Sequence, residues 1–158
     1  MNIPLLLDTS FLLPSFGVDV GKGVENCLRF LAEHRGSLRI YFSRYSILEA
    51  SLILLREVRR GQLKREEAYA MAEAGASTVA YGLEAIDESP WVFREALRLY
   101  TLGHRDMFDN ILYATAVDNE IHFLTLDRKL REFIKEHQLK DVTVTPEILR
   151  EKYGGDRS

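Results

Sequence analysis

The chain begins with a short apolar run that ends in a carboxylate. Residues Ile3–Leu7 are all apolar, and Asp8, which follows them, is the only charged side chain among the first 18 residues. A continuous apolar run of this length is typical of a strand that is buried on both faces, as in the centre of a parallel sheet. The sequence therefore predicts a central strand with an acidic residue at its carboxyl end.

Further acidic residues lie beside apolar segments in the same way: Glu49, Asp106, Asp109 and Asp127. Glu49, for example, is the only charge within residues 47–55. A carboxylate beside so much buried surface is costly unless something compensates its charge. Either each acid reaches solvent at the edge of the core, or the acids converge on a shared cation. The second arrangement predicts an enzyme.

Length and composition are those of one globular domain. The 158 residues are 46% hydrophobic and 28% charged, and we expect a single domain over residues 1–153 with a frayed tail over residues 154–158. No apolar run approaches the ~20 residues of a membrane span. One cysteine and no basic segment before Ile3 favour a cytoplasmic protein without a signal peptide. Two bound divalent cations would change the net charge from −3 to +1, so charge does not exclude a nucleic-acid partner.

Hydrophobic periodicity and capping residues predict alternating strands and helices. The expected strands are residues 3–7, 39–42, 81–86, 120–125 and 141–145. The expected helices are residues 24–34, 43–60, 64–79, 90–100, 106–118 and 128–137, with a last short helix from Pro146. This alternation predicts an α/β layer structure with a mainly parallel sheet. Leu48, Leu52 and Leu55 recur at helical spacing, and Trp91, Phe93 and Leu97 are expected in the core rather than in a base-stacking surface.

The expected places of the acids favour convergence. Asp8 and Asp127 both follow strands, and binding sites in parallel sheets form outside the carboxyl ends of the strands. Two unit charges ~4 Å apart repel by ~4 kcal/mol at an effective dielectric of about 20, so several such pairs would rival the ~5–15 kcal/mol stability of a domain. A converged cluster must therefore hold protons or a cation. Oxygen ligands suit Mg²⁺ or Mn²⁺, and such a site favours phosphodiester hydrolysis.

Each acid also has a purely structural explanation. Asp8 and Asp127 are typical turn formers or helix caps, and Asp106 and Asp109, three residues apart, suit the start of a helix. Glu49 is explained by an ion pair or by a side chain that reaches solvent. The residues alone leave both interpretations open.

The order and local context of these residues resemble the PIN-domain family of metal-dependent nucleases, in its VapC-like toxin ribonuclease branch. The matching segments are residues 5–10, 46–50, 104–116 and 123–129, of which His104–Ala116 is the most specific. Many members carry a proline where this chain has Met107, a change that should only soften the start of the helix.

The resemblance implies a three-layer α/β/α sandwich around a five-stranded, mainly parallel sheet. It implies catalytic acids at the five positions above, with Mg²⁺ or Mn²⁺ held by Asp8, Glu49, Asp109 and Asp127 and with Asp106 at or near the site. Thr9, Ser10 and Thr125 would orient these carboxylates, although ordinary turn hydrogen bonds explain them equally well. The resemblance further implies an RNA substrate, a homodimer and an antitoxin partner.

Basic residues offer a surface for RNA. Arg128 and Lys129 adjoin the expected site and are candidates for binding the phosphate backbone, with a solvated face as the alternative. For the basic cluster at residues 56–65 the solvated face is the favoured interpretation, and for His104 a helix-end hydrogen bond is favoured over an approach to the site. The alternative function is a non-catalytic RNA-binding or scaffold module. A receiver-type signalling domain is rejected because Asp8 is single and Thr145–Pro146 stands where a lysine is needed.

Overall fold

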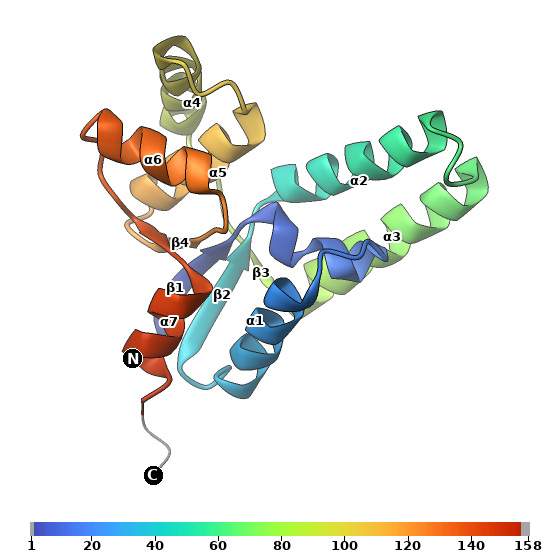
Figure 1. Cartoon of the computed structure of the whole chain (residues 1–158), viewed down its shortest axis with the longest axis horizontal. Coiled ribbons are helices and arrows are strands. Elements are labelled where there is room, and N and C mark those ends of the chain that lie inside the picture. The colour runs from blue at the N-terminus through green and yellow to red at the C-terminus, as the bar shows by residue number, and fades with distance from the viewer. Residues whose placement is uncertain (1, 156–158) are drawn as a thin grey trace.

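The sheet is five-stranded and entirely parallel, with the order β3-β2-β1-β4-β5 (Figure 1). The computed structural model describes residues 2–155, so residues 156–158 of the expected tail lie outside the described part. The strands are β1 (Ile3–Leu7), β2 (Leu38–Phe42), β3 (Glu84–Ala85), β4 (His122–Leu124) and β5 (Thr143–Val144). All four neighbouring pairs run parallel. The predicted α/β fold with a five-stranded sheet is confirmed.

Seven α-helices and two short 3₁₀ helices surround this sheet in the described part of the chain. They are α1 (Lys22–Glu33), α2 (Arg44–Arg59), α3 (Arg65–Gly82), α4 (Pro90–Leu102), α5 (Met107–Asp118), α6 (Arg128–Glu136) and α7 (Pro146–Tyr153), with η1 (Thr9–Phe11) and η2 (Leu13–Phe16) after β1. None of the described helices is long and apolar enough to cross a membrane.

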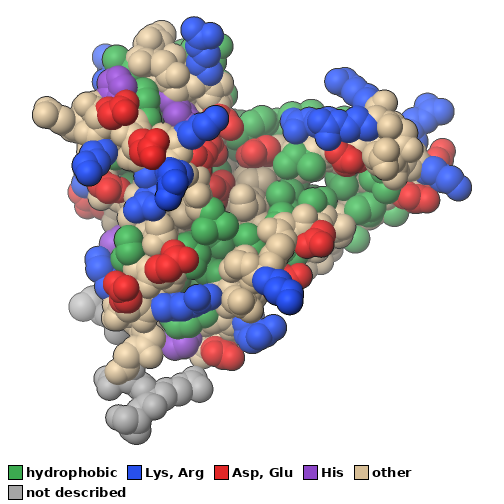
Figure 2. Space-filling model, in the orientation of Figure 1, with side chains coloured by type: hydrophobic (Ala, Val, Ile, Leu, Met, Phe, Trp, Pro, Cys, Tyr) green, Lys and Arg blue, Asp and Glu red, His purple; other side chains and the backbone are tan. Residues whose placement is uncertain are grey.

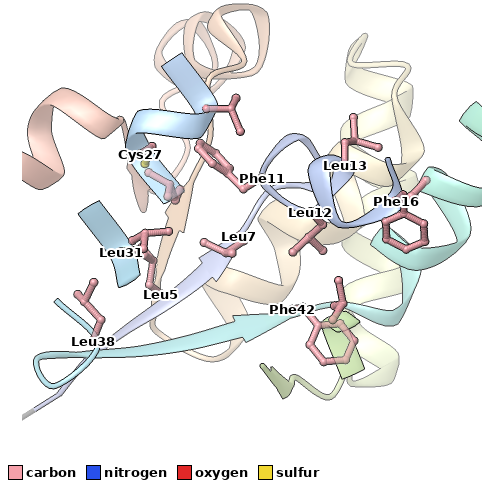
Figure 3. Close-up of a cluster of buried hydrophobic side chains, with 14 of the residues drawn as sticks. Leu5, Leu7, Phe11, Leu12, Leu13, Phe16, Cys27, Leu31, Leu38 and Phe42 are labelled. Atoms are coloured by element: carbon pink, nitrogen blue, oxygen red, sulfur yellow. The ribbon is translucent and has the colours of Figure 1, made fainter. Parts of the chain in front are cut away.

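The central strand β1 separates two hydrophobic cores. Its alternating side chains face opposite sides of the sheet, so Leu5 and Leu7 pack in one core while Leu6 packs in the other. The first core also contains residues of α1 and of both 3₁₀ helices, as Figure 3 shows for Cys27, Leu31 and Phe11. The second core contains residues of α5 and α6. Burial on both sides of β1 is what the continuous apolar run predicted.

The edge strand β3 is shorter than the predicted strand of residues 81–86. Helix α3 continues to Gly82, and Tyr81 in its last turn is 91% exposed. Only Glu84 and Ala85 pair with β2, and Glu84 accepts two hydrogen bonds from the Arg39 guanidinium at this edge. The two 3₁₀ helices were not predicted, since residues 9–16 are mostly apolar and carry no helical periodicity.

Helices α2 and α3 form a long antiparallel pair that projects from the body of the molecule (Figure 1). Close packing at its base requires Gly75, because a Cβ atom there would lie 2.4 Å from the Phe16 ring. Helix α2 buries Ser46, Ala50 and Leu54. The three leucines that recur at helical spacing lie on its other side and are exposed: Leu48, Leu52 and Leu55.

Helix α4 packs against α5 through a different face than expected. Val92, Ala96 and Leu99 are its buried residues. The prediction that Trp91, Phe93 and Leu97 belong to the core is therefore wrong, because all three are exposed. Apolar residues recur at helical spacing on both faces of this helix, so the spacing does not decide which face is buried. The face with Val92 and Ala96 has the smaller side chains, which permit a closer approach to α5.

Candidate metal centre

The acidic residues lie at the carboxyl edge of the sheet and at the starts of helices beside it. Asp8 follows β1, and its backbone N–H donates to the Leu124 carbonyl of the neighbouring strand β4 at 3.0 Å. Asp127 follows β4 and caps α6, where its Oδ1 accepts from Leu130 N at 3.0 Å. The parallel pairing of β1 with β4 thus brings the segments carrying Asp8 and Asp127 to the same edge.

Helix α5 contributes two more carboxylates. Asp106 is exposed and caps the helix, with its Oδ1 accepting from the Asp109 backbone N–H at 3.1 Å. Asp109 lies in the first turn and is buried, at 6% exposure. Its carboxyl group is hydrogen-bonded to that of Asp127. Asp106 is therefore a helix cap, as one interpretation of the sequence predicted. Asp109, in the turn that it caps, lies beside Asp127, which follows β4.

The two threonines link the remaining acids to this pair. Thr9 donates its backbone N–H to Asp8 Oδ1 at 2.7 Å and its hydroxyl to Glu49 Oε2 at 2.8 Å. Thr125 donates its hydroxyl to Asp8 Oδ2 at 2.8 Å and accepts from Asp127 N at 3.0 Å. A continuous hydrogen-bond chain therefore runs from Glu49 on α2 through Asp8 to Asp127.

Ser46, rather than Ser10, is the serine hydrogen-bonded to a threonine of this cluster. Among the described residues, Ser10 makes no hydrogen bond to these acids. Ser46 is fully buried, and its Oγ lies 2.9 Å from Thr9 Oγ1. The serine that contacts Thr9 thus comes from the first turn of α2.

Burial holds these carboxyl groups partly protonated in the absence of a cation. It raises the pKa of Asp8 to about 6, with the charges of Asp127 and Asp106 adding to the effect of burial and the Thr125 and Thr9 hydrogen bonds opposing it. Burial raises the pKa of Glu49 to about 7, again with Asp8 and Asp106 adding. Two carboxylates so placed are costly to ionise together.

The carboxyl groups of Asp109 and Asp127 shift each other's pKa in opposite directions. Burial, followed by the hydrogen bond to Asp127, raises the pKa of Asp109 to about 10. Burial works in the same direction on Asp127, but hydrogen bonds from Asp109 and from the Leu130 N–H outweigh it and lower the pKa of Asp127. The pair is therefore costly to ionise fully, and a bound divalent cation would favour release of the proton that the pair holds.

The donor set fits a hard divalent cation. All five acidic side chains offer oxygen, and their charges interact across four separate segments of the chain. Ligand atoms of His104, Asp109 and Asp127 lie within 4.8 Å of one another. Oxygen-rich sites with several carboxylates suit Mg²⁺ and Mn²⁺.

A hollow of about 770 Å³ opens beside this cluster. Asp109 and Asp127 line it together with His104, Arg105 and Lys129. Figure 2 shows acidic side chains where the α2–α3 pair meets the rest of the molecule, with Lys and Arg side chains on both sides of them. The cluster is thus open to a polyanionic ligand.

The structure separates the two basic residues that follow Asp127. Lys129 lines the hollow beside the acids, whereas Arg128 lines another hollow together with Arg131 and Lys135. Consecutive residues of a helix point about 100° apart, which explains the separation. For Arg56 the sequence favoured a solvated face without a role in the site. In the structure its charge lowers the pKa of Glu49.

Comparison with known proteins agrees with this fold. A parallel α/β sheet with carboxylates gathered at its carboxyl edge defines a class of proteins suited to binding divalent cations. The family model of the PIN domain matches residues 5–136. The chain belongs to the PIN domain family. No curated protein matches it significantly.

Three solved structures share the fold at low sequence identity. PAE2754 from Pyrobaculum aerophilum has a TM-score of 0.61 and 17% identity, with 99% of this chain and 98% of that chain covered. VapBC2 from Rickettsia felis, bound to a DNA fragment from its promoter, has a TM-score of 0.58 and 16% identity, with coverages of 90% and 98%. VapC20 from Mycobacterium tuberculosis, a toxin that cleaves the sarcin-ricin loop, has a TM-score of 0.57 and 14% identity, with coverages of 81% and 93%.

Proposed function

We propose that this chain is a metal-dependent endoribonuclease that hydrolyses phosphodiester bonds of single-stranded RNA. One observation carries the proposal: carboxylates from four separate segments lie close enough for their charges to interact in a largely buried site. Asp8, Glu49, Asp109 and Asp127 would hold Mg²⁺ or Mn²⁺, with Asp106 at the rim. Family membership supports the same conclusion.

The side chains around the acids have separate tasks in this proposal. Thr9 and Thr125 fix the orientation of Asp8 through hydrogen bonds to its two oxygens. Lys129 and Arg105 line the open side of the site, where they would attract the phosphate backbone. A bound divalent cation would lower the pKa of a water molecule and neutralise charge on the phosphate.

The similar structures support a toxin–antitoxin context. One of them contains VapB together with VapC, and another is a toxin that cleaves the sarcin-ricin loop. We extend this to the present chain as a toxin that acts on RNA in the cytoplasm, forms a homodimer and is inhibited by an antitoxin protein.

The test compares the purified protein with Asp109→Asn on single-stranded RNA. The substitution keeps the shape of the side chain but removes one ligand charge, so we expect a rate at least about tenfold lower, equivalent to about 1.4 kcal/mol of barrier. Chelation should abolish cleavage by the unmodified protein. Asp87→Asn, in an exposed side chain outside the cluster, serves as the matched control and should cleave normally.

Equal cleavage by the protein and by Asp109→Asn would indicate a contaminating nuclease. The non-catalytic alternative, an RNA-binding or scaffold module, would then be the better account. If the protein binds RNA without cleaving it, and Asp109→Asn leaves that binding unchanged, the chain is such a non-catalytic module.

A further inference from the structure

His104 occupies a buried position beside the acidic cluster. It lies in the connection between α4 and α5, its side chain lines the hollow that Asp109 and Asp127 also line, and it is 9% exposed. Its ring lies against that of Phe133, with 5.3 Å between the ring centroids. Phe133 therefore supports the imidazole on one side.

Asn110 determines which nitrogen of the His104 ring carries the hydrogen. Asn110 is fully buried, and its Nδ2 donates to the His104 carbonyl at 2.7 Å and to the Ala96 carbonyl at 3.3 Å. Because both amide hydrogens are used on carbonyl oxygens, the atom 2.7 Å from His104 Nδ1 is the amide oxygen, which can only accept. Nδ1 must therefore donate, and in the neutral ring Nε2 keeps a free lone pair.

Because Asn110 occupies Nδ1, Nε2 is the nitrogen that remains for a ligand shared with the acids. Ligand atoms of His104, Asp109 and Asp127 lie within 4.8 Å of one another. Nδ1 is occupied by Asn110, and among the described residues Nε2 has no hydrogen-bond partner. Ligands held about 2.1 Å from one ion lie at most about 4.2 Å apart, so the three side chains would have to move closer together to bind the same ion.

We infer that His104 is a metal ligand, through Nε2, and that it gives the site a preference for Mn²⁺ over Mg²⁺. The inference rests on the metal site of the proposed function and names the class of ion that the site selects. Imidazole suits first-row transition ions, whereas Mg²⁺ favours oxygen ligands and retains its water. Asn110 supports this role because the hydrogen bond at Nδ1 fixes the tautomer and the orientation of the ring.

The direct test is pulsed electron paramagnetic resonance of the full chain with Mn²⁺ bound. We expect a nitrogen coupling of the strength that a coordinated imidazole gives, and we expect it to change when the protein is labelled with ¹⁵N-histidine. This experiment uses the unsubstituted protein, so it does not depend on a variant that folds. Mn²⁺ bound without any histidine coupling would overturn the inference.

Calorimetric titrations with Mn²⁺ and Mg²⁺ give the second readout. In His104→Gln we expect the Kd for Mn²⁺ to rise by about tenfold or more and the Kd for Mg²⁺ to change much less. His34→Gln is the matched control, because His34 lies at the end of α1 and bonds only the Phe30 carbonyl through its ring. An equal loss of affinity for both ions in His104→Gln would also overturn the inference.

The outcomes separate this inference from the proposed function. Histidine-coupled Mn²⁺ in a protein that does not cleave RNA would overturn the nuclease proposal and leave His104 as a ligand. RNA cleavage with Mn²⁺ bound but without histidine coupling would overturn the inference about His104 and leave the nuclease proposal standing. Failure to bind either ion would overturn both.

Discussion

At the scale of single residues, Asp8 is buried although its carboxylate is costly to ionise in an apolar environment. Its carboxylate is 6% exposed and accepts hydrogen bonds from Thr9 and Thr125. Even so, burial raises its pKa to about 6, because the two hydrogen bonds do not offset the loss of water. Asp8 caps η1 through the Thr9 N–H, yet its raised pKa is also what we expect of a carboxylate that binds a cation.

The substitution Asp8→Asn tests this distinction. The amide keeps the shape and most of the hydrogen-bonding capacity but removes repulsion with Asp127 and Asp106. We therefore expect the free energy of unfolding without metal to stay within about 1 kcal/mol of the original or to increase, while stabilisation by Mg²⁺ or Mn²⁺ is reduced. Denaturant unfolding with and without each ion measures both effects. A large loss of metal-free stability would show that Asp8 is mainly a structural residue.

The residues that the sequence did not identify are those whose role depends on distant partners. The acids stood out because each lies beside an apolar segment, and that signal is local. His104 and Arg56 were given ordinary roles from sequence, because the Asn110 hydrogen bond and the Glu49 charge that bear on them come together only in the folded chain. Likewise, no sequence pattern distinguishes Ser46 from Ser10 as the partner of Thr9.

At the scale of elements, the start of α6 determines which basic side chain faces the site. Asp127 caps the helix, and the helical twist then directs Lys129 toward the acids and Arg128 elsewhere. In an Asp109→Asn background, which slows cleavage of the RNA, we expect Lys129→Ala to weaken RNA binding and to reduce the salt slope by about one. Arg128→Ala is the matched control and should have a smaller effect. Fluorescence anisotropy over a range of salt concentrations measures both, and a larger effect of Arg128→Ala would contradict this assignment.

Local chemistry made the strands and the helix starts predictable. The apolar run of β1 and the caps at Ser43, Asp106 and Asp127 each have a local physical cause. The packing faces of α2 and α4 did not follow from sequence, because both helices carry apolar side chains on more than one side. Which side is buried depends on the elements they meet: α2 contacts α3 and α5, and α4 packs on α5.

At the scale of the whole molecule, the acidic cluster should make stability depend on pH. The folded pKa values of Asp8 and Glu49, about 6 and about 7, exceed the ordinary values of 3.8 and 4.5. The folded state then holds protons that the unfolded state releases, so this contribution to stability is complete below the ordinary pKa values and is lost as the pH rises through the folded ones. Without metal, the free energy of unfolding should fall between about pH 4 and about pH 7, by at most ~1.4 kcal/mol per pH unit for each group.

Denaturant unfolding across this pH range, in chelator and in saturating Mg²⁺, measures the effect. Glu49→Gln removes one of the titrating groups and should flatten part of the slope, and bound metal should flatten it further. A metal-free protein that becomes more stable as the pH rises through this range would contradict the pKa assignments.

The central claim is that these carboxyl groups exchange protons for a divalent cation. Calorimetric titration of the metal-free protein with Mn²⁺ at about pH 7, repeated in buffers with different ionisation enthalpies, tests it most directly because the buffer dependence of the heat counts released protons. The account predicts binding with proton release, since burial raises the pKa of Asp109 to about 10 and that of Glu49 to about 7. It also predicts fewer protons released by Asp109→Asn. No binding, or binding with no proton release, would contradict it.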